Sequence, residues 1–90
     1  MKLDEAVLNR CKITLLYNVV SDANGNFQLG LVGKGMNNVL GVSGGSSLKE
    51  YYASRIFRNS YDIWYAEFRH ISTDVAASSR SANLVVFYFS

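Results

Sequence analysis

The chain of 90 residues contains no proline, one cysteine and one histidine. A single cysteine excludes an intrachain disulfide and a cysteine-based zinc site, and Cys11 is expected to be a partly buried, small apolar residue. No Cys, Asp or Glu lies at a metal-ligand spacing around His70, which predicts a structural histidine and neither a metal ion nor another cofactor. Because proline is absent, the turns must be made by Gly, Asn, Asp and Ser.

Charge is also scarce, and long apolar runs are missing. Charged residues make up 18% of the chain, against ~25% in typical domains, which indicates a covered face or a partner. The longest apolar run, Leu84–Phe89, has six residues, whereas a membrane-spanning helix needs about 20. Asp4 and Glu5 stand where a secretory signal would be apolar. We therefore expect a cytoplasmic protein that makes no contact with a membrane, with a single domain over residues 1–90.

The basic residues are concentrated in the middle of the chain. Residues 34–58 carry a net charge of +3, while residues 1–33 are neutral and residues 59–90 carry −1. The middle residues, called the basic stretch below, contain one acidic residue, Glu50, and four basic ones: Lys34, Lys49, Arg55 and Arg58. An excess of basic side chains attracts anionic groups, so this stretch is where a binding site is first expected.

The first third of the chain predicts one helix and one hairpin. Apolar residues at three- and four-residue spacing predict a short helix over residues 3–11. β-Branched and aromatic residues predict strands over residues 13–20 and 27–33. Asn24-Gly25 between them is a strong hairpin signal, so we expect the two strands to pair. Along the first strand, one face is expected to hold Ile13, Leu15, Tyr17 and Val19.

The rest of the chain predicts helices on both sides of a third strand. A loop rich in Gly, Asn and Ser ends in a capping-box pattern at Ser47 to Glu50, which predicts a helix over residues 47–59. Residues 63–71 predict a strand, and residues 73–82 a last helix. Leu84–Phe89 is either helix or strand, because a short apolar run shows no period. The predicted fold is α+β: a small, mostly antiparallel sheet, made of the hairpin and the third strand, packed against helices.

Two features of the basic stretch point to a binding site. Gly44 to Ser47 lead into the predicted helix, whose N-terminal N–H groups would bind an anion within reach of Lys34; the alternative is a connector whose glycines only permit turns. Adjacent Tyr51 and Tyr52 must place at least one ring on the surface, where it stacks on a base or anchors a protein interface. The predicted ligand or partner contacts are Lys34, Ser46, Ser47, Lys49, Tyr51, Arg55 and Arg58.

Two short motifs, Leu15-Leu16-Tyr17 and Leu31-Val32-Gly33-Lys34-Gly35, resemble the two tyrosine motifs of GIY-YIG nucleases. The resemblance implies a nuclease-like domain over residues 13–85, in which Tyr17 assists the attacking water and Arg55 or Arg58 stabilises charge on the phosphate. Leu31 stands in place of the second tyrosine, and the last predicted helix lacks the metal-binding glutamate. The resemblance therefore implies the fold without its metal-dependent activity.

The sequence shows neither a carboxylate pair nor a nucleophile motif that points to an enzyme. We expect a small, non-catalytic binding module, such as an inhibitor or a phage-type protein that acts on host machinery. Its partner is expected to be a protein or an anionic ligand, including nucleic acid, held by the basic stretch. Two alternatives stay open: a degenerate GIY-YIG-like nuclease, and a structural homo-oligomer, such as a homodimer, formed through Leu84–Phe89 at an exposed sheet edge.

Overall fold

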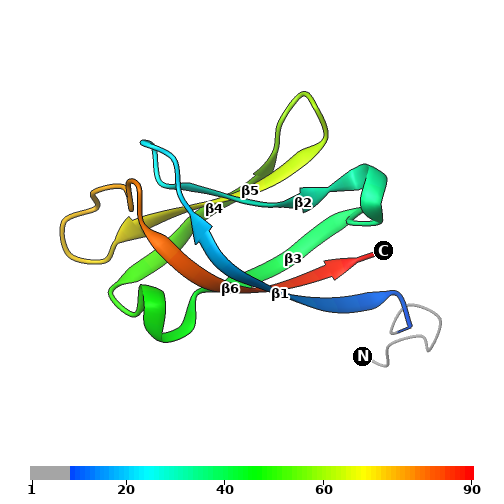
Figure 1. Cartoon of the computed structure of the whole chain (residues 1–90), viewed down its shortest axis with the longest axis horizontal. Coiled ribbons are helices and arrows are strands. Elements are labelled where there is room, and N and C mark those ends of the chain that lie inside the picture. Colours follow the sequence, from blue (N-terminus) through cyan, green and yellow to red (C-terminus); the bar gives the residue numbers. More distant parts are fainter. Residues whose placement is uncertain (1–8) are drawn as a thin grey trace.

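The computed structural model describes residues 9–90, which form six β-strands and two short 3-10 turns (Figure 1). The strands are β1 (Cys11–Val20), β2 (Asn26–Leu31), β3 (Asn38–Ser43), β4 (Tyr51–Arg58), β5 (Ile63–His70) and β6 (Ser81–Phe89). The turns η1 (Val32–Lys34) and η2 (Gly45–Leu48) lie before and after β3. Over residues 9–90, no helix has the length and apolar character that a membrane span requires.

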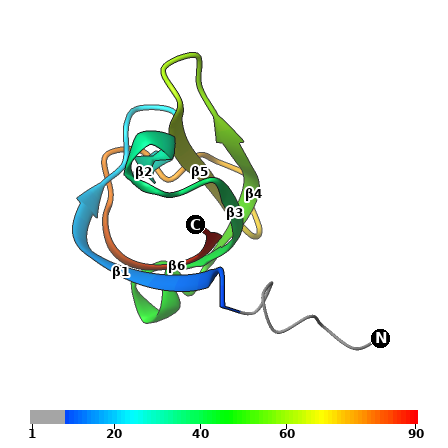
Figure 2. The ribbon, with the colours of Figure 1, turned by 90° about the vertical axis from the view of Figure 1, so that its right-hand side faces the viewer.

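The strands form two antiparallel sheets of three strands each, in the orders β1-β6-β3 and β2-β5-β4. Among the six strands of residues 9–90, only β4 and β5 are neighbours both in the chain and in a sheet, because the other connections pass from one sheet to the other. Seen along the long axis, the two sheets curve toward each other around a common interior (Figure 2). The arrangement is a β-sandwich, in which each sheet buries one face against the other.

Strand β6 is the central strand of its sheet, paired with β1 on one side and with β3 on the other. Its side chains alternate between the two faces, so that Leu84 and Val86 point between the sheets and are fully buried. A β-bulge between Leu16 and Val19 shifts the register of β1 against β6. Beyond this bulge, Val19 packs on the core.

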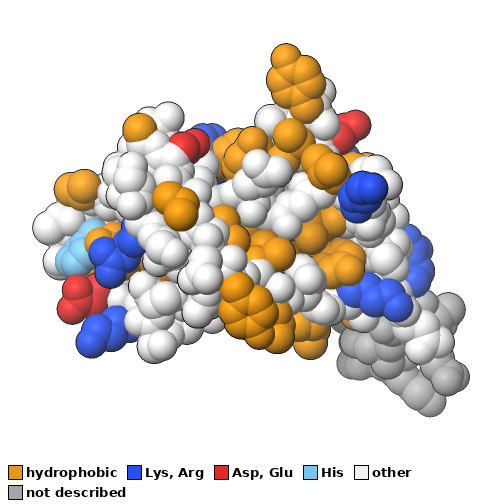
Figure 3. Space-filling view, in the orientation of Figure 1, with side chains coloured by type: hydrophobic (Ala, Val, Ile, Leu, Met, Phe, Trp, Pro, Cys, Tyr) orange, Lys and Arg blue, Asp and Glu red, His pale blue; other side chains and the backbone are white. Residues whose placement is uncertain are grey.

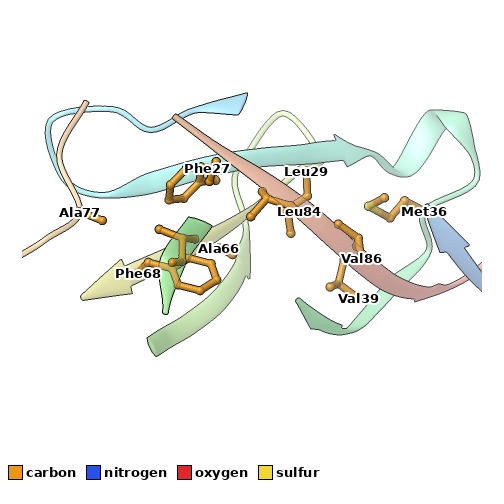
Figure 4. Packing of buried hydrophobic residues seen from close by; sticks show 11 residues of the cluster. Phe27, Leu29, Met36, Val39, Ala66, Phe68, Ala77, Leu84 and Val86 are labelled. Carbon is orange, nitrogen blue, oxygen red and sulfur yellow. The ribbon is translucent and has the colours of Figure 1, made fainter. Parts of the chain in front are cut away.

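The interior is filled by one cluster of apolar side chains (Figure 4). Phe27 of β2 and Phe68 of β5 meet edge to face, with 5.6 Å between their ring centroids. Each large apolar side chain buried in this way contributes roughly 1.5–3 kcal/mol to stability. The buried members are Phe27, Leu29, Met36, Val39, Leu48, Ala66, Phe68, Ala77, Ala82, Leu84 and Val86.

The turn between β1 and β2 links the two sheets and is packed against the body of the protein. The Asp22 carboxylate accepts a hydrogen bond from the N–H of Asn24 at 2.8 Å. Desolvation raises the pKa of Asp22 but is outweighed by such donors, so the pKa lies below its ordinary value. Gly25 has φ 79°, and a Cβ there would lie 2.8 Å from the Phe68 carbonyl oxygen and 2.9 Å from the Ala77 nitrogen. Only glycine fits this position without displacing backbone.

The predicted α+β class is wrong, because the described residues form an all-β sandwich. The helix expected over residues 47–59 is η2 followed by strand β4, and the helix expected over residues 73–82 is a loop that leads into β6. A β-bulge between Ala53 and Arg55 breaks the alternation of β4. Tyr51 and Ile56 therefore both pack on the core although they are five residues apart. In a regular strand two such residues would point to opposite faces, so the two-residue period of a strand is not visible in this sequence. Most of the helix predicted over residues 3–11 lies outside the described residues.

The predicted hairpin is also wrong, although both of its strands exist. Strand β1 pairs with β6, and β2 pairs with β5, so the Asn24-Gly25 turn joins strands of different sheets. The Gly25 carbonyl accepts a hydrogen bond from the Phe68 N–H at 3.0 Å, which docks the turn on β5. The strand predicted over residues 63–71 is confirmed as β5. Leu84–Phe89 is strand, and it lies in the centre of its sheet, where it is not an exposed edge.

Candidate functional site

The residues predicted to bind a partner do not come together in one place. Turns η1 and η2 lie at opposite ends of β3, toward opposite ends of the molecule (Figure 1). Lys34, in η1, is therefore far from Ser46 and Ser47 in η2 and from Lys49 behind it. Since β4 replaces the predicted helix, η2 does not present the N-terminal N–H groups on which the anion site depended.

Ser47 has a structural position. Its hydroxyl donates a hydrogen bond to the Gly44 carbonyl at 2.5 Å and accepts one from the Asn83 N–H at 3.2 Å. The bond from Asn83 fastens η2 to β6, next to buried Leu48, and the bond to Gly44 closes the turn itself. The serine that looks like a helix cap in the sequence therefore links two segments that are distant in the chain.

Arg55 and Arg58 lie on β4, and each already has an acidic and an aromatic neighbour. The Arg55 guanidinium lies 4.2 Å from the centre of the Phe57 ring, and the Arg58 guanidinium lies 5.8 Å from that of Trp64. Arg55 Nε is 3.8 Å from a Glu67 carboxylate oxygen, and Arg58 Nε is 3.6 Å from the Asp62 carboxylate. These neighbours reduce the positive charge that the two arginines offer to an anion.

Tyr51 and Tyr52 point to opposite sides of β4. Tyr51 is partly buried, packs edge to face on His70, and has the Arg80 guanidinium 4.7 Å from its ring centre. Tyr52 is the more exposed of the two, and its hydroxyl donates to the Asp74 carboxylate at 2.6 Å. This hydrogen bond raises the pKa of Tyr52. The tyrosine that was predicted to contact a partner is thus the less accessible one.

The outer face of sheet β2-β5-β4 carries a network of paired polar groups centred on Glu67. Its carboxylate accepts a hydrogen bond from the Ser54 hydroxyl at 2.6 Å and one from Arg69 Nε at 3.2 Å. The hydrogen bond from Ser54, together with the charges of Arg69 and Arg55, outweighs desolvation and lowers the pKa of Glu67. Beside this network, the rings of Phe57 and Tyr65 stack with 5.5 Å between their centroids.

The outer face of the other sheet is apolar and exposed. Ile13, Leu15 and Tyr17 of β1 and Phe87 of β6 are 65%, 55%, 69% and 41% exposed. The register places Ile13 beside Phe87 and Leu15 beside Val85, so these side chains adjoin one another. Figure 3 shows hydrophobic side chains gathered where Figure 1 draws β1 and β6. We call Ile13, Leu15, Tyr17, Val85 and Phe87 the apolar face.

Strand β3 borders the apolar face with small residues. Gly41 pairs with Phe87, and Ser43 pairs with Val85. A Cβ at Gly41 would lie 3.9 Å from the Phe87 ring, which is an ordinary van der Waals contact. Leu40, at the β-bulge of β3, is exposed at the edge of this surface. The outer surface is therefore raised along β1 and low along β3.

The apolar face lies outside the basic stretch and contains none of the predicted contact residues. The sequence does show apolar residues at alternate positions, namely Ile13, Leu15 and Tyr17, but in a small domain alternating apolar residues usually belong to the core. The expected face is correct for these three residues and wrong for Val19, because the bulge turns that side chain inward. Cys11, expected to be partly buried, is exposed at the start of β1.

The residues named by the nuclease resemblance lie on different parts of the sandwich. Tyr17 belongs to the apolar face, whereas Arg55 lies on the other sheet, beside Glu67. The arginine that the resemblance places on a helix is on strand β4. The structure therefore does not bring this tyrosine and this arginine to one site.

Residues 9–90 form no pocket, and no three His, Cys, Asp or Glu side chains among them are placed to hold a metal ion. Comparison of the chain with protein-family models, curated proteins and solved structures found no match. The candidate site is therefore defined by geometry: an uncharged, contiguous apolar face on one sheet of a small β-sandwich.

Proposed function

We propose that the protein is a non-catalytic interaction module that binds a protein partner through the apolar face. The observation that supports this function is the area of that face. At roughly 150–250 Å² for a fully exposed large side chain, Ile13, Leu15, Tyr17 and Phe87 present about 400–500 Å² to solvent. This lies in the middle of the ~300–600 Å² range of the largest patches on monomeric proteins, which are often functional.

The charge distribution favours the apolar face over the basic stretch as the contact surface. Arg55 and Arg58 are paired with carboxylates, and Lys34 and Lys49 lie at separate ends of β3. Leaving apolar side chains in water costs roughly 25 cal/mol per Å². Covering the apolar face with a partner recovers that free energy, whereas an anionic partner of Arg55 and Arg58 competes with Glu67 and Asp62 for the two guanidinium groups.

Site-specific photo-cross-linking tests this function. A photoreactive amino acid is placed at Leu15 on the apolar face, at Lys49 in the basic stretch, or at Gln28, an exposed position on the other sheet. Each variant is irradiated in extract of the source cells, and the products are identified by mass spectrometry. We expect protein adducts from position 15 and none from position 28. Adducts from position 49 but not from position 15 would show that the contact surface is the basic stretch.

An anionic partner and a nuclease activity are tested together by fluorescence anisotropy with short DNA and RNA. Binding that weakens with salt and is lost in Arg55→Ala would support a phosphate contact by the basic stretch. Cleavage that requires Mg²⁺ and is lost in Tyr17→Phe would support the nuclease alternative. The cytoplasmic location is part of the same proposal, and a fluorescent fusion in the source cells tests it.

A further inference from the structure

We infer that the partner of the apolar face is a second copy of this chain, packed face to face about a two-fold axis that runs parallel to the strands. The inference rests on the proposed function and names the partner of the same surface. Three properties of the outer surface of sheet β1-β6-β3 lead to it: its charge, its shape and its area.

The outward side chains of this sheet carry no charge. Two copies of a chain with net charge +2 repel wherever their basic groups face each other. At the apolar face, an uncharged group opposes another uncharged group, and the Arg10 guanidinium lies outside it, at the end of the sheet, 5.9 Å from the centre of the Phe89 ring. The outward residues in register are Cys11, Ile13 and Leu15 on β1, Val85, Phe87 and Phe89 on β6, and Gly41 and Ser43 on β3.

The outer surface of this sheet, raised along β1 and low along β3, is complementary in shape to the same surface of a second copy. A two-fold rotation about an axis parallel to the strands and centred on β6 places the raised strand β1 of one copy over the low strand β3 of the other. In this register Ile13 lies over Gly41 of the second copy, and Leu15 lies over its Ser43. Phe87 meets the same residue of the second copy on the axis. A closed dimer of this kind uses one patch on both subunits.

The exposed area of the apolar face agrees with the area that a stable dimer interface buries on each subunit. A stable interface buries about 800 Å² on each partner. The four most exposed side chains of the apolar face supply more than half of that area, and exposed Leu40 adds to it at the border. Two sheets that pack face to face lie about 10 Å apart, so the side chains of both copies meet in the middle.

Sedimentation velocity from about 1 µM to about 1 mM, a range that covers weak and moderate dimers, tests the inference. The wild-type chain of 10.0 kDa is expected to double its mass as its concentration rises. Leu15→Asp, which puts a carboxylate on the apolar face, and Gly41→Val, which fills the low side, are expected to stay monomeric. Gln28→Asp is the matched control, because it puts the same charge on an exposed position of the other sheet and is expected to dimerise like the wild type. Thermal unfolding of each variant shows whether it is folded.

Cross-linking tests the axis. In a Cys11→Ser background, the Leu15→Cys and Ser43→Cys variants are mixed and treated with a bismaleimide that spans about 10 Å, the distance between packed sheets. We expect a mixed dimer, and no product from Leu15→Cys alone. A wild-type chain that stays monomeric throughout, or a dimer that Leu15→Asp leaves intact, would overturn the inference. A monomer that still gives adducts with another protein from position 15 would overturn the homodimer while leaving the proposed function in place.

Discussion

Three glycines make it possible to separate backbone strain from steric conflict within one chain. Gly25 has φ 79°, and a Cβ there would meet two backbone atoms at 2.8 and 2.9 Å. Gly35 has φ 98° but no atom within 4 Å of such a Cβ, and Gly33 has neither a positive φ nor a neighbour. Alanine at Gly25 therefore adds both backbone strain and a steric clash. Alanine at Gly35 adds backbone strain alone, and alanine at Gly33 adds neither.

The expected losses of stability follow from these environments. A side chain at positive φ costs about 1–2 kcal/mol, so Gly35→Ala is expected to lose that amount. Overpacking against neighbours that cannot move costs about 1–3 kcal/mol more, so Gly25→Ala is expected to lose about 2–5 kcal/mol. Gly33→Ala is expected to gain up to about 1 kcal/mol, because alanine reduces the entropy of the unfolded chain.

Urea unfolding followed by circular dichroism measures the three differences, and the slope against urea shows whether the transitions stay comparable. For a domain of this size, 1 kcal/mol corresponds to a change in Tm of about 4–8 °C. The Gly25→Ala variant should therefore melt well below the Gly35→Ala variant. Equal losses at these two positions would refute the packing that we assign to the turn between β1 and β2.

The remaining predictions concern an ion pair network, a loop and the core. A carboxylate with a lowered pKa stabilises the fold above its unfolded pKa of about 4, and this contribution is lost as the pH falls. Between about pH 5 and pH 2, the free energy of unfolding measured with urea should therefore fall less for Glu67→Gln than for the wild type. An identical fall in both proteins would contradict the hydrogen bonding of Glu67. Ser47→Ala should cost about 1 kcal/mol, measured by thermal unfolding, while exposed Ser46→Ala changes stability by less than about 0.5 kcal/mol. Phe27→Ala should cost about 3–5 kcal/mol, or abolish the cooperative melt, whereas exposed Tyr61→Ala leaves the Tm unchanged; a mild effect at Phe27 would show that the sheets pack differently.

The strands could be predicted where local chemistry and the final environment agree. Aromatic and β-branched residues identify β5 correctly, because this central strand keeps one regular alternation along most of its length. Strand β4 was mistaken for a helix since a capping-box pattern precedes it and a β-bulge at Ser54 interrupts its period. The pattern is real, but Ser47 uses its hydroxyl to hold β6, a contact between residues 36 positions apart that no local signal reports.

The pairing of the strands and the position of the candidate site were harder to predict from the sequence than the strands themselves. Asn24-Gly25 predicts a tight turn, and the turn is there, but it does not determine which sheet receives each strand. The site prediction rests on charge, whereas Arg55 and Arg58 are each paired with a carboxylate, Arg55 with Glu67 of the neighbouring strand and Arg58 with Asp62 in the loop that follows. The apolar face becomes visible only when the pairing of Ile13 with Phe87 is known, because the two residues lie at opposite ends of the chain.

The central place of β6 also determines when this protein can fold. Of the six described strands, β1 is the first to be synthesised and its pairing partner β6 is the last. Until β6 emerges, β1 and β3 have no strand between them, and Leu16 and Val19 of β1 lack the core side chains of β6 on which they pack. Pairing between such distant segments is slow, on the order of milliseconds to seconds. An unpaired strand edge and exposed apolar side chains favour aggregation, so the chain is most prone to aggregate before the sheet β1-β6-β3 closes.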